Sequence, residues 1–413
     1  MSRVLIVGGT GFIGRHLAAA LRDAGHEVTA LGRNGLDLVG DDEVVLAGRL
    51  RGQDVVVNAA GLVRDQGRNT MAAVHADGAC RLFRACQTAG VKRLIHLSAL
   101  GAAVDGETAY QSTKGAAEAA LAQCESLDWC VLRPSVVIGR GGASTAVLNA
   151  LAALPLVPRI GPGTWQVQPV HVDDVAELVV RLVEWAGDLP RRLDVVGPQP
   201  LTTDALTATL RHWLGLPPPR WLPLPEPLLW AVAVVGERVM DGPLNRDVLA
   251  MLKRGNIADP TAMVAALGRP PRGVDQALAR HPAAQADRWQ GRLFFVRPVL
   301  RLSLAALWIA TGLLSLGLYP VTDSLRMLAE LGIHGGLADV ALYGGGAMDL
   351  LLGALLVLRW RPVAVGGAML LAMLAYTGLA VGLPGEYWLH PFAPLLKNLP
   401  IAAATLAMMV LED

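Results

Sequence analysis

The 413-residue sequence is poor in cysteine, in aromatic side chains and in charge of either sign. Its four cysteines contain no C-x-x-C pair and have no histidine at zinc-ligand spacing, so we expect reduced, buried thiols and no metal site. The 36 basic and 35 acidic residues nearly cancel, so no nucleic-acid partner is expected. The sequence is instead rich in apolar residues, which make up 53% of the chain. This fraction is high for a protein that is soluble throughout.

The apolar excess lies after residue 290, in four runs at about 298–318, 337–358, 362–383 and 395–411. Three of them reach the ~20 residues with which a helix crosses a bilayer, and the fourth is marginal. They show almost no amphipathic alternation, which disfavours buried helices of a soluble protein. We therefore predict a membrane domain over residues 291–413.

Arginines flank these runs unevenly. Arg292, Arg297 and Arg301 surround the start of the first run, and Arg359 and Arg361 follow the second. Basic residues collect in cytoplasmic loops, so we expect a multi-pass protein of the inner (plasma) membrane with both termini in the cytoplasm.

The first 14 residues carry the pattern of a dinucleotide-binding strand, turn and helix. An apolar run over Val4–Val7 is followed by glycines, and a helical pattern begins at Phe12. The glycines fit G-x-G-x-x-G or G-x-x-G-x-x-G, which permits a tight turn, close approach of a pyrophosphate and close packing of the helix. We therefore expect the cofactor phosphates beside Gly8, Gly9, Thr10, Gly11, Phe12, Ile13 and Gly14.

The residues after the second expected strand, 27–31, favour NADP(H) over NAD(H). An NAD site has an acidic residue about 20 positions beyond the glycines, where it binds the ribose 2′-hydroxyl. Here the strand ends beside Arg33, whose guanidinium suits a 2′-phosphate. Asp37 is close enough in sequence to serve as the acidic residue of an NAD site, so NAD(H) remains the alternative cofactor. Residues 36–38 themselves are predicted to form a short third strand.

Strands and helices alternate over the first 196 residues. Further strands are expected at 54–58, 93–97 and 194–196, the last at a sheet edge, and helices at 12–24 and 70–89. This alternation predicts right-handed crossovers and an α/β, doubly wound parallel sheet.

Tyr110 and Lys114 are four residues apart in a segment of strong helix formers, so both side chains lie on one helix face. An ammonium beside a phenol favours the phenolate. We therefore expect Lys114 to lower the pKa of Tyr110, which would make the tyrosine an acid or base near neutrality. Ser98 ends the preceding strand and is expected to hold a substrate oxygen.

Five segments resemble, in this order, the extended and atypical short-chain dehydrogenase/reductases: GGTGFIG, DVVVNAAG, LIHLSALGA, YQSTK and WCVLRPSVVIGRGG. QPVHVDDVAELV is similar to a later motif of that family. The resemblance covers about residues 1–290 and implies a Rossmann fold, a nicotinamide cofactor and a Ser/Tyr/Lys catalytic set. It also implies that His171, Asp173 and Asp174 are structural or helix-capping.

Transferred residue by residue, the resemblance makes Tyr110 the proton donor or acceptor, Lys114 the ligand of the nicotinamide ribose, and Ser98 the group that polarises the carbonyl. The other implied cofactor contacts are Asp37 and Leu38 at the adenine, Asn58, Ala59, Ala60 and Gly61 along the diphosphate and ribose, and Arg133 and Pro134 near the nicotinamide. The short segment between the second and fourth strands and the sequence Ser98-Ala99-Leu100 depart from the family pattern. Because of these two departures, a protein that binds the cofactor without catalysis remains an alternative.

Residues 197–290 are expected to form a substrate lobe. The prolines between 217 and 227 cannot lie in one helix, so they predict an extended segment over the substrate cleft. The apolar run 228–235 is too short to span a bilayer, and packing in the lobe is favoured over resting on the membrane surface.

The membrane domain contains an ionisable residue, Asp349, one turn beyond the small residues 344–346. We favour a packing role over a ligand site, and Lys397 could pair with Asp349 or Glu386. Residues 387–390, with Tyr387, Trp388 and His390, are predicted to form an interfacial belt.

Three segments resemble the DoxX-like membrane module over about residues 297–413: LWIATGLLSLGLYP, LYGGGAMDLLLG and EYWLHPFAPLLKNLP. The resemblance implies a compact four-helix transmembrane bundle, and some DoxX-group proteins are associated with quinone-linked redox systems.

Together these features predict a membrane-anchored NAD(P)H-dependent oxidoreductase. Its substrate would be the carbonyl or hydroxyl of an apolar, lipid- or quinone-derived small molecule. The expected partners are the lipid bilayer and this substrate, with a quinone and a homo-oligomer left open. A non-catalytic NAD(P)H-binding sensor or assembly protein and an epimerase that retains NAD are the alternatives.

Overall fold

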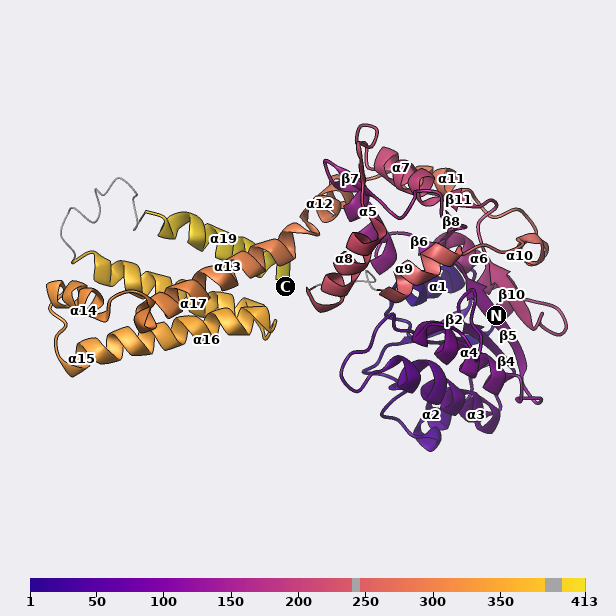
Figure 1. The fold of residues 1–413 in the computed structure, drawn as a ribbon. Helices are drawn as coiled ribbons and strands as arrows, with labels where there is room; N and C mark the ends of the chain where they lie inside the picture. Colours follow the sequence, from indigo (N-terminus) through magenta and orange to yellow (C-terminus); the bar gives the residue numbers. More distant parts are fainter. Residues whose placement is uncertain (240–245, 383–395, 413) are drawn as a thin grey trace. The chain divides into compact units, whose positions relative to one another are not determined.

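The computed structural model describes residues 1–239, 246–382 and 396–412. The chain divides into two compact units, Met1–Arg292 and Leu293–Asp413 (Figure 1). Each unit is described below by itself.

Unit 1 is built on a six-stranded parallel sheet with the strand order β10-β5-β4-β3-β1-β2. Its strands are β1 (Arg3–Val7), β2 (Glu27–Leu31), β3 (Val55–Asn58), β4 (Arg93–Leu97), β5 (Asp128–Pro134) and β10 (Arg192–Val195). The predicted doubly wound sheet is therefore confirmed, with β10 at an edge as expected.

The predicted third strand at residues 36–38 is wrong. These residues form turns between β2 and the helix α2 (Glu43–Leu50). The Asp37 carboxylate accepts the Val39 N–H at 3.0 Å, and the Asp37 N–H donates to the Asp41 carboxylate at 2.9 Å. Because side chains satisfy these backbone groups locally, the segment does not need a strand partner. The apolar pair Leu36 and Leu38 is buried against the helix layer, which explains why it looked like a strand.

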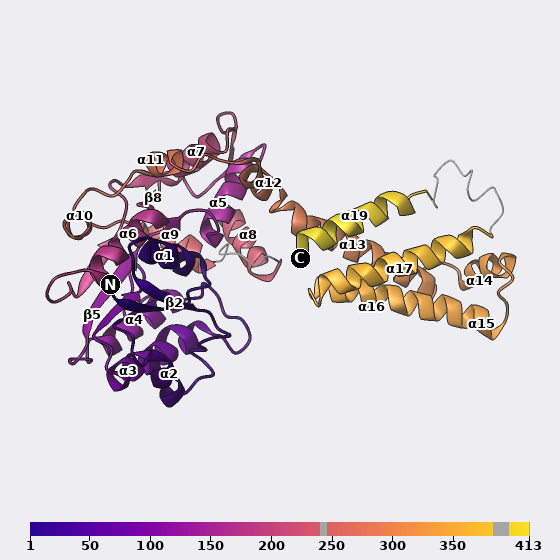
Figure 2. The same ribbon diagram turned by 180° about the vertical axis from the view of Figure 1, so that it is seen from behind.

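Helices cover both faces of the sheet (Figures 1 and 2). On one face, α1 (Phe12–Asp23) packs beside α6 (Val172–Val183). On the other face lie α2, α3 (Ala79–Ala89), which the π-helix η1 (Ala72–Gly78) precedes, and α4 (Ala109–Leu121). Alternate residues of β1 belong to the two layers, Val4 and Ile6 to the first and Leu5 and Val7 to the second. Burial on both faces explains the unbroken apolar runs of these strands.

The remainder of unit 1 is a lobe of helices and short strands. Its helices are α5 (Ala143–Ala153), α7 (Thr203–Trp213), α8 (Glu226–Val239), α9 (Arg246–Arg254), α10 (Thr261–Leu267), α11 (Val274–Ala279) and α12 (Gln285–Leu293). Its strands are β6 (Val137–Ile138), β7 (Val157–Arg159), β8 (Gln166–Val167), β9 (Val170–His171), β11 (Leu201–Thr202) and β12 (Trp221–Pro223). The proline-rich segment contains β12, which pairs with β7 in parallel, and α8 begins directly after it.

In unit 2, the helices α13 (Val296–Leu313), α16 (Gly345–Val357), α17 (Pro362–Ala380) and α19 (Asn398–Glu412) share one apolar core. The π-helix η2 (Leu314–Leu318) extends α13. The remaining helices are α14 (Val321–Glu330), α15 (Gly336–Asp339) and the π-helix η3 (Val340–Gly344). Within the described residues, three continuous helices are long and apolar enough to cross a membrane: Val296–Leu318, Gly336–Val357 and Pro362–Ala380. The helix α19 is shorter, and the predicted fourth run begins outside the described residues.

The intramembrane carboxylate has a different partner from the one expected. Asp349 of α16 is buried, and the Tyr376 hydroxyl of α17 donates to its Oδ1 at 2.9 Å. Lys397 is exposed, and no bond joins it to Asp349 among the described residues. Glu386 and the predicted interfacial belt of Tyr387, Trp388 and His390 lie outside the described part of the chain.

Candidate functional site

The glycine turn after β1 has the backbone that a dinucleotide site requires. Gly8 has a φ of +77°, and a Cβ there would lie 2.8 Å from the Ala60 nitrogen. A Cβ on Gly14 would collide with the Gly8 carbonyl oxygen, so only glycine lets α1 pack this closely. Gly11 caps α1 without a side chain, and the first turn of the helix holds no acidic residue. The first N–H groups of α1 are therefore left for an anionic group, which fits a pyrophosphate.

The two candidates for contact with the adenosine ribose differ in their surroundings. The Asp37 carboxylate pairs with the Arg68 guanidinium at 2.6 Å. Arg33 lies in the turn after β2, is exposed, and has no hydrogen bond or ion pair within the described residues. Leu38 is buried and its carbonyl accepts from Arg81 at 2.5 Å. Of the three residues predicted at the adenosine end of the cofactor, Arg33 alone has a charged side chain without an ion pair among the described residues.

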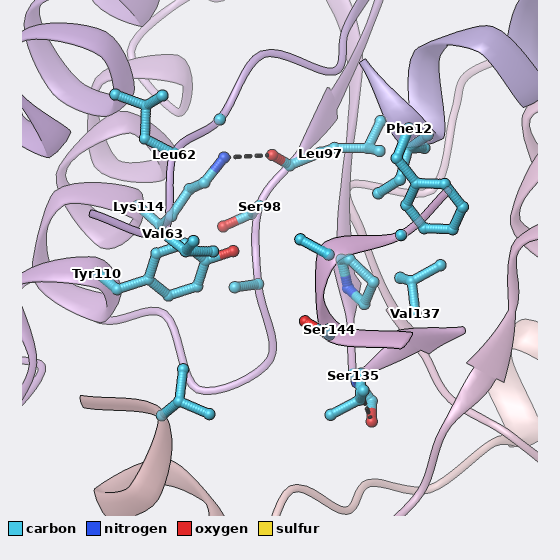
Figure 3. Close-up of a pocket in the computed structure, with 18 of the residues that line it drawn as sticks. Phe12, Leu62, Val63, Leu97, Ser98, Tyr110, Lys114, Ser135, Val137 and Ser144 are labelled. Carbon is cyan, nitrogen blue, oxygen red and sulfur yellow. Dashed lines mark hydrogen bonds between the residues drawn. The ribbon is translucent and has the colours of Figure 1, made fainter. Parts of the chain in front are cut away.

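A cavity of about 400 Å³ lies next to the glycine turn, at the carboxyl ends of the strands. It brings together many of the predicted site residues: Gly11, Phe12, Ile13, Ala59, Ala60, Gly61, Ser98, Tyr110, Lys114 and Pro134. Other predicted residues are not part of its lining: Gly8, Gly9, Thr10, Gly14, Arg33, Asp37, Leu38, Asn58 and Arg133. In Figure 3, Tyr110, Lys114 and Ser98 form one side of the cavity, opposite Phe12 and Val137.

Tyr110 and Lys114 lie on one face of α4, as predicted, but the expected effect on the tyrosine pKa is wrong. The Lys114 ammonium donates to the Leu97 carbonyl at 2.8 Å (Figure 3). No described residue hydrogen-bonds to the Tyr110 hydroxyl. Burial therefore dominates: it raises the pKa of Tyr110 above its usual 10.0 and lowers the pKa of Lys114 to about 8. At neutral pH the tyrosine is a phenol.

The hydroxyl of Ser98 is engaged by a residue that the sequence analysis missed. Its Oγ donates to the Glu118 carboxylate at 2.5 Å. The same carboxylate accepts three hydrogen bonds from the Arg133 guanidinium, at 2.6, 2.9 and 3.1 Å. The Ser98 hydroxyl is the donor in this bond, so its proton points to Glu118, and Arg133 is not among the residues that line the cavity. Glu118 is four residues beyond Lys114, so the spacing on α4 was a signal that could have revealed it.

His75 is a second residue that the sequence analysis missed. Its Nε2 accepts the Leu62 N–H at 2.8 Å, and its Nδ1 bonds to the Thr113 hydroxyl at 3.1 Å. Its ring meets the Tyr110 ring edge to face, with centroids 5.5 Å apart. Burial lowers the pKa of His75 to about 2, so the ring is neutral and holds the loop above Lys114 against α4.

The wall that faces Tyr110 is mostly apolar. Val137 lies there with Phe12 (Figure 3), and the lining also includes the apolar residues Leu62, Val63, Val136, Val248, Met251 and Leu252, the last three from α9. Besides Ser98, Tyr110 and Lys114, the lining residues with polar side chains are Ser135, Ser144, Asp247 and Asn256. The helical periodicity of α9 was the sequence signal for these contacts, but only the tertiary structure shows that they reach the cavity.

His171, Asp173 and Asp174, which the family resemblance implied to be structural or helix-capping, lie at the start of α6. His171 caps this helix, since its Nδ1 accepts the Asp173 N–H at 3.2 Å. The buried Asp174 pairs with Arg269 and Arg272. These contacts are structural, as the family resemblance implied. The ligand atoms of His171, Asp173 and His281 also lie within 4.8 Å of one another, a grouping that could hold a metal ion and that local spacing could not reveal.

Comparison with known proteins gives two family matches. Residues 4–195 match the model of the NAD dependent epimerase/dehydratase family, and residues 305–406 match that of the DoxX-like family. The chain is 31% identical over 248 residues to the ceramide reductase of Caulobacter vibrioides, covering 56% of this chain and 77% of that protein.

The chain is also 28% identical over 256 residues to NADH dehydrogenase (ubiquinone) 1 alpha subcomplex subunit 9, mitochondrial, of Arabidopsis thaliana. This match covers 55% of the chain but only 61% of that relative's length. Among solved structures, the UDP-glucose 4-epimerase of Thermus thermophilus in complex with NAD has a TM-score of 0.51 at 22% identity. That match covers 67% of this chain and 96% of the other and shows the fold.

Proposed function

Because the chain belongs to the NAD-dependent epimerase/dehydratase family and carries a DoxX-like membrane domain, we propose that it is a membrane-anchored NADP(H)-dependent reductase. Its substrate would be a carbonyl on an apolar, lipid- or quinone-derived molecule. The observation that carries this proposal is one cavity with Tyr110 and Lys114 on one side and an apolar wall on the other.

The lining of the cavity supports an apolar substrate over a nucleotide sugar. A diphosphate group needs cationic or N–H donors, and Lys114 is the single cationic side chain among the described lining residues. The N–H groups at the start of α1 are already assigned to the cofactor. This arrangement favours a reductase over an epimerase of nucleotide sugars.

The side chains in the cavity suit the proton transfer that accompanies reduction. NADPH, when bound, supplies the hydride that adds to the carbonyl carbon. Tyr110 is protonated because burial raises its pKa, so it can donate its proton to the carbonyl oxygen and complete the alcohol. Lys114 would hold the ribose next to Tyr110, and His75 keeps the tyrosine ring in place.

The cofactor preference rests on Arg33. Its guanidinium is exposed after β2, where a 2′-phosphate would lie, whereas Asp37 is occupied by Arg68. This difference supports NADP(H) over NAD(H).

The test is NADPH oxidation by the full-length protein in detergent, with a panel of apolar ketones and quinones. Tyr110→Phe is the matched variant, since it removes only the phenolic hydroxyl. Turnover in the parent that is lost in the variant, with NADPH binding retained, would support the proposal. Absence of NADPH and NADH binding in both proteins would refute it.

A non-catalytic cofactor sensor is the second candidate, and one observation favours it. The Ser98 proton is directed to Glu118 and is not available to polarise a carbonyl. Tight NADPH binding without turnover of any ketone or quinone in the parent would select the sensor.

We also propose that the protein lies in the inner membrane. The arginine-rich ends of its membrane helices and both chain termini would then face the cytoplasm. Arg297, Arg301 and Arg359 lie together around the Glu412 carboxylate. Such a concentration of basic residues is typical of the cytoplasmic side. Labelling of an introduced cysteine beside Arg361 by an impermeant thiol reagent, in intact cells and in inverted vesicles, tests this orientation.

A further inference from the structure

The helix α8 presents an apolar face to the surroundings. Leu228 and Val232 lie one turn apart and are 47% and 43% exposed. Leu222, just before the helix, is 40% exposed. No charged residue occurs between Pro227 and Gly236. A helix that faces water places polar residues at such positions, as α9 does with Lys253 and Arg254, so water is not the expected neighbour of this face.

The helix α12 has a similar face. Trp289, in the middle of this helix, is 57% exposed. Contacts within unit 1 hold this helix in place. Asp287 pairs with Arg140 at 2.8 Å, and Gly291 lies against α5, where a Cβ would be 3.3 Å from the Ala153 side chain.

Elements of unit 1 that contact or follow one another connect α12 with α8. The helix α12 packs on α5, and α5 leads through the exposed Leu156 into β7. Strand β7 pairs with β12, and β12 leads into α8. Figures 1 and 2 allow this path to be followed from α12 through α5 to α8.

The chain itself indicates what covers this surface. Only Phe294 and Phe295 separate the end of α12 from α13, the first of the long apolar helices. The bilayer that contains α13 is therefore the apolar phase within reach of α12. Tryptophan and the other aromatic residues are favoured at its interface.

We propose that the apolar side chains of Leu222, Leu228, Val232 and Trp289 in unit 1 lie on the bilayer in which the C-terminal helices are embedded. The pair α8–α9 is then the side by which an apolar substrate leaves the lipid. Glu226 of α8 pairs with Lys253 of α9, and α9 lines the cavity through Val248, Met251 and Leu252. This access step rests on the proposed reductase function, whereas the contact with lipid does not.

Lipid contact is tested with the full-length protein in vesicles of phosphatidylcholine and phosphatidylglycerol. A Val232→Cys variant, with Cys80 replaced by alanine, is labelled with an environment-sensitive fluorophore, and brominated lipids are used as quenchers. Val44→Cys is the matched control, because Val44 is 80% exposed on α2, at the other end of unit 1 (Figure 1). We expect quenching at position 232 and none at position 44.

Equal quenching at the two positions, or none at either, would overturn the proposal. A label at position 232 that is shielded from lipid but cross-links to the same position of another chain would also overturn it, since a second copy would then cover the face.

The access route is tested with Leu228→Ser and Val232→Ser combined. Turnover of a long-chain ketone dissolved in the vesicles should fall several-fold, while turnover of a short water-soluble ketone is retained. An equal effect on both substrates would overturn the access route. If the parent reduces neither ketone, the reductase proposal fails, and the quenching experiment still decides the contact with lipid.

Discussion

The Ser98 hydroxyl donates to the Glu118 carboxylate at 2.5 Å, and the Arg133 guanidinium donates three hydrogen bonds to the same carboxylate. Ser98 directly follows β4, whereas Glu118 and Arg133 lie on α4 and β5, and of the three only Ser98 lines the cavity with Tyr110. This contact both orients the serine and connects α4 to the sheet.

We expect Glu118→Gln to reduce the free energy of unfolding of unit 1 by about 3 kcal/mol, since it leaves the Arg133 charge half-buried without its carboxylate. Ser98→Ala should cost only about 1 kcal/mol, the usual net value of one hydrogen bond. Urea denaturation followed by tryptophan fluorescence measures both. Glu125→Gln, an exposed carboxylate after the same helix, is the control and should change stability by less than about 0.5 kcal/mol. Equal effects of the two glutamate variants would show that the Arg133 pair does not stabilise the fold.

Arg33→Asp should weaken NADPH binding roughly 10- to 100-fold, because it replaces a cation at the 2′-phosphate by an anion. Binding of NADH, which lacks that phosphate, should change much less or improve. Isothermal titration calorimetry with both cofactors provides the measurement. The charge-matched control is Arg51→Asp, because Arg51 is an exposed arginine at the end of α2. A parallel loss of affinity for NADPH and NADH would rule out a specific role of Arg33.

Because His75 is buried in its neutral form, we expect the stability of the folded protein to fall in acid. Its pKa is about 2 in the folded protein, because burial disfavours the imidazolium, and near 6.5 in the unfolded chain. Below pH 6.5 the unfolded chain therefore binds the proton that the folded state excludes. Stability falls by about 1.4 kcal/mol per pH unit until the folded pKa is reached.

His75→Asn removes this titration, so its unfolding free energy should decline less between pH 6.5 and pH 4.5 than that of the parent. Denaturation curves at several pH values test the difference. The control is His212→Asn, which changes an exposed histidine on α7 outside the cavity. An unchanged profile in His75→Asn would mean that other groups, such as the buried His96, dominate acid unfolding.

In the membrane unit, Tyr376→Phe should destabilise the bundle by about 1 kcal/mol, because it leaves the buried Asp349 without its hydrogen bond. Thermal unfolding in detergent, followed by the helical circular dichroism signal, is the measurement. Tyr343→Phe is the control, since Tyr343 is 44% exposed and has no hydrogen-bonded hydroxyl among the described residues. Equal stability of the two variants would indicate that the Tyr376–Asp349 bond contributes nothing.

Much of the fold was predictable because its signals are local. The apolar run of β1, the glycines before α1 and the i, i+4 pair of Tyr110 and Lys114 each depend on a few neighbouring residues. The segment at residues 36–38 misled for the same reason. An apolar, polar, apolar triplet occurs both in strands and in turns. Here the Asp37 carboxylate accepts the Val39 N–H and stabilises the turn.

The sequence by itself determined the alternating strands and helices, the glycine turn, the helix face with Tyr110 and Lys114, and the apolar helices of the second unit. Each follows from periodicity and from the backbone conformations that a residue type permits. Only the tertiary structure decided the partners of Ser98 and Asp349, the direction of the Tyr110 pKa shift and the contribution of α9 to the cavity. These depend on which residues distant in sequence meet, and on how far water is excluded where they meet.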